Sequence, residues 1–334
     1  MIPQGIATRQ THDWQTELAQ VVRDPGELAE LLDLDPAALG VAVAEEQFPL
    51  RVPRPYLARM RRGDAADPLL LQVLPNAREL DQVPGYGLDP LQERTANPVP
   101  GLIHKYHGRV LLLASPACAI HCRYCFRRHF DYPANTPGRQ QWDRALDYIR
   151  NDSSITEVIY SGGDPLAASD VMLAWLTAQV EAIPHVRCLR IHTRLPVVIP
   201  SRIDEHLLRW LSASRLARVL VLHVNHRNEI DHDLATAVQR LHDAGVTVLN
   251  QSVLLAGVND CEDRLAELSQ GLFSARILPY YLHMMDPVAG AAHFSVDKAR
   301  AIALHRRLLA RLPGYLVPRL VQESAGHSHK VPLG

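Results

Sequence analysis

Three cysteines lie within eight residues of this chain. Cys118, Cys122 and Cys125 belong to the segment SPACAIHCRYCFRRHF and are spaced four and three residues apart. Thiolates at this spacing can converge on one metal centre from a single loop. A [4Fe–4S] cube is normally held by four cysteines, so three cysteines leave one iron open to an exogenous ligand. The sequence therefore predicts an iron–sulfur cluster with an open coordination position.

Other uses of these thiols stay open on the residues alone. One alternative is a structural zinc site with His121 or a remote residue as the fourth ligand, although zinc sites usually combine two CxxC pairs and no second pair is present. Unligated thiols are another alternative. Cys188 and Cys261 are isolated, which is a poor pattern for a disulfide framework and favours a metal site in a reducing compartment.

The composition narrows the class of protein and of partner. The chain has 334 residues, 47% of them hydrophobic, enough for one large α/β domain and a smaller accessory region. Its net charge of −1 gives no electrostatic case for nucleic acid or a membrane surface as the main partner. The first residues lack a signal-peptide pattern, and no apolar run reaches the roughly 20 residues that span a bilayer. We expect a cytoplasmic protein.

From residue 109 onward, β-rich runs alternate with amphipathic helical patterns. This alternation predicts βαβ units and a parallel sheet. Six or seven such units indicate an α/β fold, a partial (β/α)6-type TIM barrel, although periodicity alone leaves its closure open. The expected strands are 109–115, 156–163, 188–193, 218–224, 246–255, 275–283 and 314–321, and the expected helices include 141–151, 171–182, 204–214 and 234–245.

The cysteine segment directly follows the first expected strand. Catalytic groups of β/α barrels lie at the C-terminal ends of strands, so this loop is where chemistry is expected. Residues 1–100 are predicted to be a mainly helical accessory region that ends in a linker, and residues 101–334 the barrel core. The helical patterns cover 14–24, 25–34 and 53–63, and the Pro- and Gly-rich linker covers 82–101.

The motif CxxxCxxC, with the aromatic Tyr124 before its last cysteine, resembles the signature of the radical S-adenosylmethionine (SAM) superfamily. The resemblance implies that the open iron of the [4Fe–4S] cluster chelates S-adenosylmethionine. One-electron reduction, by a flavodoxin- or ferredoxin-type donor, would then yield a 5′-deoxyadenosyl radical. The motif alone does not name the substrate.

Further segments resemble the lysine 2,3-aminomutase family of that superfamily. The nearest match is the short branch that forms (R)-β-lysine for elongation factor P, and the N-terminal segment 48–75 resembles that branch as well. The other segments that carry the resemblance are GLIHKYHGRVLLLASPACAIHCRYCFRRHF, YSGGDPL, LHVNHRNEI, LNQSVLLAGVND and PYYLHMMDPVAGAAHF.

Membership of this family implies pyridoxal 5′-phosphate (PLP) as a further cofactor. Moving an amino group between adjacent carbons by a radical requires delocalisation, which PLP supplies through an imine, and a lysine holds the resting Schiff base. Lys330, in HSHKVPLG, matches the family's PLP lysine, although by itself its position suggests an exposed tail. Lys105, Tyr106 and Arg109 match positions that face the PLP phosphate, and their ordinary interpretation is a basic strand edge.

The resemblance also implies a binding site for both ends of lysine. Arg127 matches the arginine that holds the substrate carboxylate in a bidentate geometry, and we do not assign this role to Arg128. Asp286 and Glu323 match the acidic positions that hold the side-chain amine. Position 323 is glutamate as in the short branch, where the free-lysine branch has aspartate. Alone, two such carboxylates would be solvated surface groups.

The S-adenosylmethionine site is predicted from the same resemblance. Gly162, Gly163 and Asp164 match the glycine-rich edge that receives the methionine amino group, although glycines after a strand also make plain turns. His223 and Gln251 match positions that contact the nucleoside or carboxylate, and Tyr124 is expected beside the cofactor. The remaining histidines, His226, His283 and His293, have no assigned role and are expected to be structural.

The implied activity is that of an isomerase, an L-lysine 2,3-aminomutase that converts L-α-lysine into β-lysine through the adenosyl radical and a PLP aldimine. The β-lysine would modify elongation factor P, with a lysyl-tRNA-synthetase-like ligase as a functional partner. A free-lysine aminomutase of catabolism or secondary metabolism is the nearest alternative. A non-catalytic iron–sulfur redox protein is an alternative from another class, and it would leave Lys330 without a role.

The sequence departs from the longer members of the family, which bind structural zinc through a cysteine-rich C-terminal extension. Cys261 matches one of their zinc cysteines but lacks its partners here, so we expect a free thiol. Cys188 is expected to be a small buried apolar residue. Without that extension, a monomer or homodimer is expected.

Overall fold

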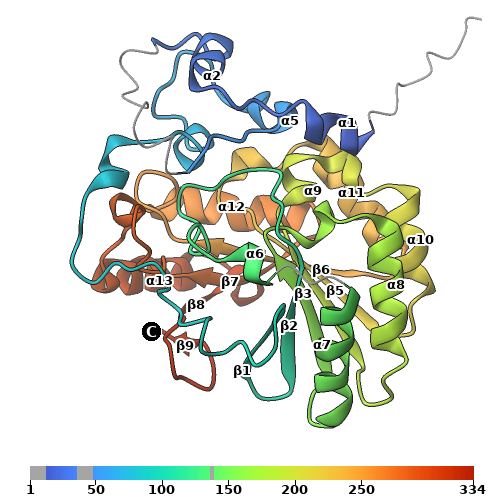
Figure 1. The fold of residues 1–334 in the computed structure, drawn as a ribbon. Coiled ribbons are helices and arrows are strands. Elements are labelled where there is room, and N and C mark those ends of the chain that lie inside the picture. The colour runs from blue at the N-terminus through green and yellow to red at the C-terminus, as the bar shows by residue number, and fades with distance from the viewer. Residues whose placement is uncertain (1–12, 36–47, 136–138) are drawn as a thin grey trace, which may run out of the picture.

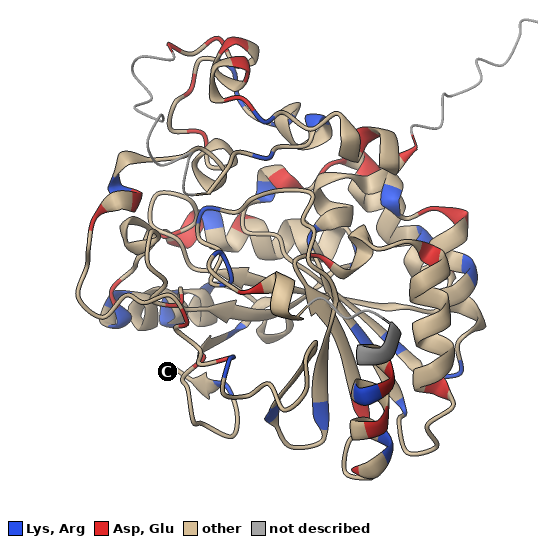
Figure 2. Ribbon diagram, in the orientation of Figure 1, with Lys and Arg blue, Asp and Glu red and all other residues tan. Residues whose placement is uncertain are grey.

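A computed structural model describes residues 13–35, 48–135 and 139–334. Parts of the predicted accessory region, residues 1–12 and 36–47, lie outside the described residues. No helix in the described ranges is both long and apolar enough to cross a bilayer. Basic and acidic residues are interspersed along the outer helices (Figure 2), in keeping with the net charge of −1.

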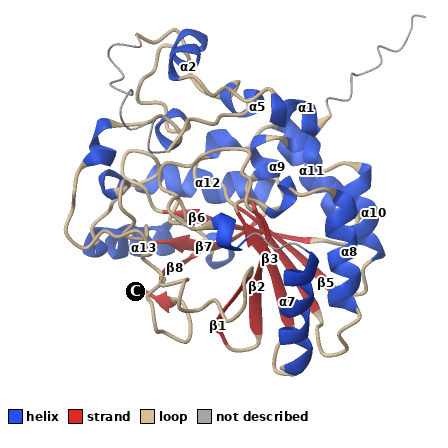
Figure 3. Ribbon diagram, in the orientation of Figure 1, coloured by secondary structure: helices blue, strands red, loops and turns tan. Residues whose placement is uncertain are grey.

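One sheet with the strand order β1 to β9 forms the centre of the molecule (Figures 1 and 3). Neighbouring strands from β2 to β8 run parallel, whereas β1 and β9 pair antiparallel at the two edges. The two edges do not pair with each other within the described residues, so the barrel is partial. The strands are β1 (Leu102–Tyr106), β2 (Arg109–Ser115), β3 (Glu157–Gly162), β4 (Cys188–Thr193), β5 (Ala217–Leu222), β6 (Thr247–Val253), β7 (Leu278–His283), β8 (Arg319–Gln322) and β9 (Val331–Pro332).

Each of the strands β2 to β7 is followed by a helix on the outside of the sheet, which confirms the predicted partial (β/α)6-type barrel. These helices are α7 (Arg139–Asn151), α8 (Asp170–Glu181), α10 (Glu205–Ala213), α11 (His232–Asp243), α12 (Glu262–Ser274) and α13 (Lys298–Arg311). Shorter helices lie in the connections: α6 (Tyr132–Asn135), α9 (Leu195–Val198), η3 (Pro165–Ala167), η4 (Pro200–Arg202), η5 (Arg227–Glu229), η6 (Ala292–Phe294) and η7 (Gly314–Leu316). The strand expected over 314–321 begins only at Arg319, because η7 occupies its start and Pro318 has no N–H for the ladder.

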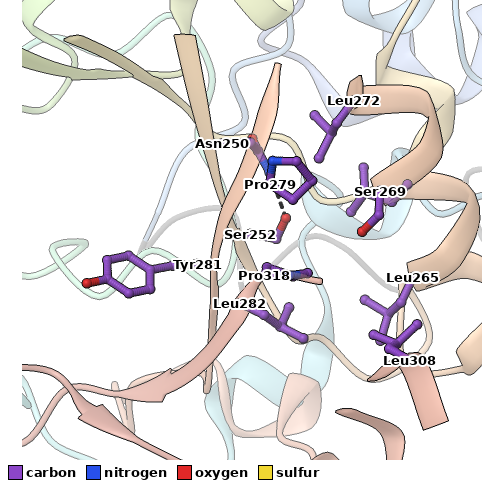
Figure 4. A pocket seen from close by; sticks show the side chains of 11 residues that line it. Asn250, Ser252, Leu265, Ser269, Leu272, Pro279, Tyr281, Leu282, Leu308 and Pro318 are labelled. Atoms are coloured by element: carbon purple, nitrogen blue, oxygen red, sulfur yellow. Dashed lines mark hydrogen bonds between the residues drawn. The ribbon is translucent and has the colours of Figure 1, made fainter. Parts of the chain in front are cut away.

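Successive side chains along a strand point alternately to the hydrophobic core, between the sheet and the helices, and to the interior of the barrel. In β4, Leu189 and Ile191 are fully buried in the layer between sheet and helices, whereas Arg190 and His192 point to the other face. Packing on the helix side is tight. A gap of only about 10 Å³ is left where Leu265 and Leu272 of α12 meet β6 and β7, and Figure 4 shows the side chains that line it. Arg190 and His192 are thereby directed into the barrel interior, whereas the polar Asn250 and Ser252 of β6 lie buried on the helix side.

The accessory region packs over the end of the barrel where the strands terminate (Figure 1). Its elements are α1 (Trp14–Ala19), α2 (Pro25–Leu31), α5 (Arg54–Leu57), η1 (Leu70–Gln72) and η2 (Ala77–Leu80). The helix expected over 14–24 ends at Ala19, because Val22 forms a bridge with Val52 through two backbone hydrogen bonds of 2.8 and 2.9 Å. The β-branched Val21 and Val22 favour this extended backbone.

Candidate active site

A cavity of about 870 Å³ occupies the interior of the partial barrel. Every residue predicted to bind a cofactor or substrate lines it. These residues are Lys105, Tyr106, Arg109, Cys118, Cys122, Tyr124, Cys125, Arg127, Gly162, Gly163, Asp164, His223, Gln251, Asp286, Glu323 and Lys330. Residues separated by more than 200 positions in sequence thus face one space, as the order of the parallel strands requires.

The three cysteines lie in the loop after β2. Burial raises the pKa of Cys118, and the neighbouring Cys125, Asp164 and Cys122 raise it further. In the described part of the chain, no three His, Cys, Asp or Glu side chains are placed so that they could hold a single metal ion. A cubane cluster does not require that geometry, because each thiolate binds a different iron atom and the sulfurs stand farther apart. Three thiols from one loop that lines the cavity are the ligands that a cluster with one open iron requires.

A glycine turn at the end of β3 packs against the start of the cysteine loop. A Cβ atom at Gly162 would lie 2.2 Å from the carbonyl oxygen of Ser115, and one at Gly163 would lie 2.6 Å from that of Ala117. The backbone N–H of Gly163 donates to Ser115 over 2.8 Å, and that of Asp164 to Ala117 over 2.7 Å. Only glycine permits this approach, so the turn fixes where the cysteine loop begins.

Asp164 is fully engaged within the protein. One carboxylate oxygen accepts hydrogen bonds from the Thr193 hydroxyl at 2.6 Å and the Leu166 N–H at 3.0 Å. The other accepts from the N–H groups of Arg194 and Leu195 at 2.7 and 2.8 Å. Burial raises the pKa of Asp164 despite these donors. The side chain joins the ends of β3 and β4, and its predicted contact with the methionine amino group stays a prediction.

Arg194 is a functional candidate that the sequence reasoning missed. It directly follows β4, is nearly fully buried, and donates from Nη1 to Sγ of Cys122 over 2.7 Å. Its Nη2 donates to Glu229 at 3.0 Å and to Gln72 at 2.8 Å. Burial alone would lower the pKa of Arg194, but Cys122 and the other negative partners raise it. Its position at a strand end was a signal that could have identified it.

The Tyr124 hydroxyl belongs to the same network. It accepts hydrogen bonds from Arg194 and, over 2.6 Å, from Asn225. The ring packs edge-on against Phe294 with centroids 6.1 Å apart. Tyr124 therefore presents its ring to the cavity while its hydroxyl group is bound by the protein.

Arg127 already holds a carboxylate in its guanidinium fork. Its Nε and Nη2 donate to the two oxygens of Glu93 over 2.6 and 2.8 Å, and both side chains are more than 90% buried. Its Nη1 donates to the Ser161 hydroxyl at 2.9 Å and to the Gly162 carbonyl at 3.3 Å. Sequence reasoning missed Glu93, because it lies in the segment predicted to be a linker.

Ion pairs continue from Glu93 to the other end of the cavity. Nζ of Lys105 lies 3.2 Å from Glu93 and 3.0 Å from Glu323, and Nζ of Lys330 lies 2.5 Å from the other oxygen of Glu323. Burial would raise the pKa of Glu323, but Lys330 and Lys105 hold it below its usual range. Burial and the Glu323 carboxylate together raise the pKa of Asp286 to about 7. Acidic and basic groups therefore alternate along one wall of the cavity.

Comparison with known proteins decides the family. The radical SAM superfamily matches residues 112–269. The chain is 49% identical over 330 residues to the L-lysine 2,3-aminomutase of Escherichia coli K12, covering 98% of this chain and 96% of that protein. It is 47% identical to the enzyme of that name from Haemophilus influenzae, covering 99% and 98%, and 37% identical to that from Clostridium subterminale, covering 96% and 78%.

The chain belongs to the lysine 2,3-aminomutase family. It is therefore a radical SAM isomerase, and the family's cofactors are a [4Fe–4S] cluster, S-adenosylmethionine and PLP. Membership favours an enzyme over a non-catalytic redox protein. It also favours a cluster over zinc, and His121 is directed elsewhere: its Nδ1 hydrogen bonds to the Pro49 carbonyl at 2.7 Å and its ring stacks on Phe48.

The residues at the strand starts fit the phosphate of a family cofactor. Arg109 stacks on the Tyr106 ring, 4.7 Å from its centroid, and has no acidic partner among the described residues. Arg319, at the start of β8, also lines the cavity without an ion pair in the described ranges. Lys105, by contrast, bonds to Glu93 and Glu323. Arg109 is therefore the predicted cation that stays available to a phosphate.

His223 and His283 line the cavity. Nε2 of Gln251 lies 2.8 Å from Nε2 of His223, and burial lowers the pKa of His223 to about 3. This pair brings together two residues predicted to contact S-adenosylmethionine. Of the unassigned histidines, His226 accepts from the Asn228 N–H, whereas Nε2 of His283 and Nδ1 of His293 find no hydrogen-bond partner in the described residues.

The two isolated cysteines differ from each other. Cys261 is an exposed free thiol, as predicted, at the start of α12. Cys188 was predicted to be buried and apolar, and this is wrong: it is partly exposed, and its Sγ donates to Glu157 over 3.5 Å. Burial and the Glu157 carboxylate raise the pKa of Cys188 to about 12. Cys188 lies on the same face of β4 as Arg190, which lines the cavity as Glu157 does, and so it is not part of the core.

Proposed function

We propose that this protein is an L-lysine 2,3-aminomutase that forms (R)-β-lysine for the modification of elongation factor P. The observation that carries the proposal is the pair Asp286 and Glu323. Both carboxylates face the cavity that also holds Lys330, Arg127 and the cysteine loop. A substrate with a carboxylate at one end and an ammonium group at the other matches this distribution of charge.

At the ammonium end, Glu323 and Asp286 have different roles. Glu323 is ionised and bound by Lys105 and Lys330 in the ligand-free protein. Lys330 would hold PLP, and as an imine it would no longer offer an ammonium charge to Glu323, which could then accept the ammonium group of lysine. The pKa of Asp286 is about 7 in the ligand-free protein. The ammonium group of a bound lysine would favour its ionised form. A glutamate side chain would be repelled by both groups.

At the carboxylate end, Arg127 orients the substrate. Its contacts with Ser161 and Gly162 fix the guanidinium beside the end of β3. When bound, the cluster with S-adenosylmethionine supplies a hydrogen-abstracting radical, and PLP carries the migrating amino group. Held at both ends, lysine presents one C–H bond in a fixed orientation, and the enclosing barrel wall excludes water.

The elongation factor P role and the setting of the enzyme are parts of the same proposal. They are supported by the resemblance to the short branch, in which position 323 is glutamate as it is here. We further propose a cytoplasmic monomer or homodimer that uses a flavodoxin- or ferredoxin-type reductant. The division into residues 1–100 and 101–334 also stays a proposal, and the contacts of Glu79 and Glu93 with the cysteine loop cross it.

The test is an anaerobic assay of the reconstituted protein with L-lysine, S-adenosylmethionine, PLP and dithionite. Mass spectrometry after chiral derivatisation detects β-lysine and its stereochemistry. (R)-β-Lysine is the expected product. 5′-Deoxyadenosine without β-lysine would contradict lysine as the substrate, and glutamate, arginine and lysylated elongation factor P would then be tested.

The physiological destination requires a separate measurement. Deleting the gene in its host should abolish the β-lysyl mass increment on elongation factor P, and a plasmid copy should restore it. An unchanged elongation factor P in the deletion strain would contradict this role while leaving the isomerase activity intact.

A further inference from the structure

We propose that Glu93 is a positioning residue that sets Arg127 for the substrate carboxylate. The inference rests on the proposed function and adds to it a residue from the segment before the barrel. Glu93 lines the cavity, and its carboxylate makes a bidentate ion pair with Arg127. Burial opposes its ionisation, yet Arg127 and Lys105 keep the pKa of Glu93 below its usual range.

The contacts of Arg127 determine what it can offer a ligand. A guanidinium group has five N–H donors. One on Nε and one on Nη2 bind Glu93, and Nη1 binds Ser161 and Gly162. The second N–H of Nη2 is the donor that these contacts leave. A substrate carboxylate therefore meets Arg127 end-on, from a direction that Glu93 sets, and not in the bidentate geometry predicted from the sequence.

Glu93 is held too firmly to act as a carboxylate that the substrate displaces. Its backbone N–H donates to Asp89 over 2.9 Å. The same loop is tied to the Asp286 segment, because Gly87 donates to Pro287 and accepts from Ala289 at 3.0 and 2.9 Å. Displacing Glu93 from Arg127 would leave a buried charge without its partner, which is strongly unfavourable. Glu93 therefore stays in place when substrate binds.

The charge of Glu93 also links the two ends of the substrate site. Lys105 bridges Glu93 and Glu323, so the arginine for the carboxylate and the acid for the ammonium group are joined by one cation. Arg127 is neutralised by Glu93 and Lys105 by Glu323, so these four residues carry no net charge, and a substrate carboxylate is directed by the one N–H that Arg127 still offers. Removing the Glu93 charge frees Arg127 to rotate and releases Lys105 towards Glu323.

The decisive experiment compares Glu93→Gln and Glu93→Asp with wild-type holoenzyme. We expect the KM for L-lysine to rise at least tenfold in Glu93→Gln, with a smaller fall in kcat and unchanged iron content and S-adenosylmethionine affinity. Preference for L-lysine over L-lysinamide, which lacks the carboxylate, should shrink. Glu205→Gln, in an exposed pair with Arg240, is the matched control and should leave these values unchanged.

A double-mutant cycle shows whether Glu93 acts through Arg127. In an Arg127→Lys background, Glu93→Gln should raise the KM no further. Glu93→Asp keeps the negative charge but moves it away from Arg127 by one methylene. If Glu93→Gln does not fold, the KM for L-lysine, the iron content and the S-adenosylmethionine affinity of Glu93→Asp test the same inference.

Several results would overturn the inference. A lower KM for L-lysine in Glu93→Gln would mean that Glu93 competes with the substrate. An unchanged KM would mean that Glu93 does not position Arg127. Equal losses of lysine and S-adenosylmethionine affinity would mean that Glu93 has a structural role only. Wild-type protein that forms no β-lysine would instead refute the proposed function, and it is measured first.

Discussion

Lys330 faces Glu323 across the β8–β9 hairpin, with Nζ 2.5 Å from a carboxylate oxygen. Gln322 pairs with Val331 in that hairpin. Glu323 directly follows Gln322 and Lys330 directly precedes Val331, so the two charged residues lie next to this pair. The short strand β9 thereby fixes a lysine near the end of the printed sequence inside the barrel. The contact with Glu323 holds the Lys330 side chain at the cavity.

Replacing Lys330 separates cofactor attachment from the rest of the site. Lys330→Ala should keep the cluster and S-adenosylmethionine binding but lose the visible absorbance of bound PLP and all turnover, because the other amine beside Glu323, that of Lys105, is held between Glu93 and Glu323. Lys330→Arg is the control, since it restores a cation beside Glu323 without a nucleophilic amine. Absorbance spectra and the β-lysine assay report both properties, and wild-type turnover in either variant would exclude Lys330 as the attachment site.

Removing the Asp286 charge should weaken lysine binding selectively. A charge-assisted hydrogen bond contributes about 1.5–3 kcal/mol, so Asp286→Asn should raise the KM for L-lysine about 10- to 100-fold. The affinity for S-adenosylmethionine, measured by equilibrium dialysis, should stay as in the wild type. Equal losses for both ligands would mean that Asp286 does not contact the substrate.

The raised pKa of Asp286 predicts a pH dependence of kcat/KM. Burial and then Glu323 favour its protonated form up to a pH of about 7, against the opposing charges of Lys330 and Lys105. The ionised form attracts the substrate ammonium group, so kcat/KM should fall about tenfold per pH unit below 7 and be flat above it. In Asp286→Asn this acidic limb should disappear, and its persistence would assign the limb to another group.

The raised pKa of Asp286 makes stability fall with rising pH, whereas it makes kcat/KM rise. Because the folded-state pKa of Asp286 is raised, its favourable contribution to the free energy of unfolding is complete near pH 4 and is lost as the pH rises towards 7. Denaturant unfolding of ligand-free protein should show this decline, and Asp286→Asn should reduce it.

The repeating core was predictable because its signals are local. Runs such as Arg109–Ser115 and Cys188–Thr193 are β-rich and are separated by helical periods, so the parallel strands and most outer helices followed. β9 was not predictable, because two residues carry no period and its pairing with β8 depends on the fold. The helices α12 and α13 were not among those named from the sequence.

The site was predictable where a motif marks a residue and not where partners are distant. Cys118 and Lys330 were found from motifs and line one cavity. Glu93 and Arg194 carry no motif: one lies in a Pro- and Gly-rich loop, and the other follows a strand. Their importance comes from ion pairs with Arg127 and Glu229, 34 and 35 residues away, which only the folded chain brings together.

The last prediction tests the glycine turn that fixes the cysteine loop. In Gly163→Ala, the new Cβ would lie 2.6 Å from two backbone carbonyl oxygens, those of Pro116 and Ala117, which cannot move as a flexible side chain would. Overpacking of this kind costs about 1–3 kcal/mol.

The free energy of unfolding of ligand-free Gly163→Ala should therefore fall by that amount, and the iron bound after reconstitution should fall with it. Gly314→Ala is the matched control, because a Cβ there meets nothing within 4 Å. Its stability and iron content should equal those of the wild type. If Gly163→Ala unfolds and binds iron like that control, the contact between the β3 turn and the cysteine loop does not set the geometry of the cluster.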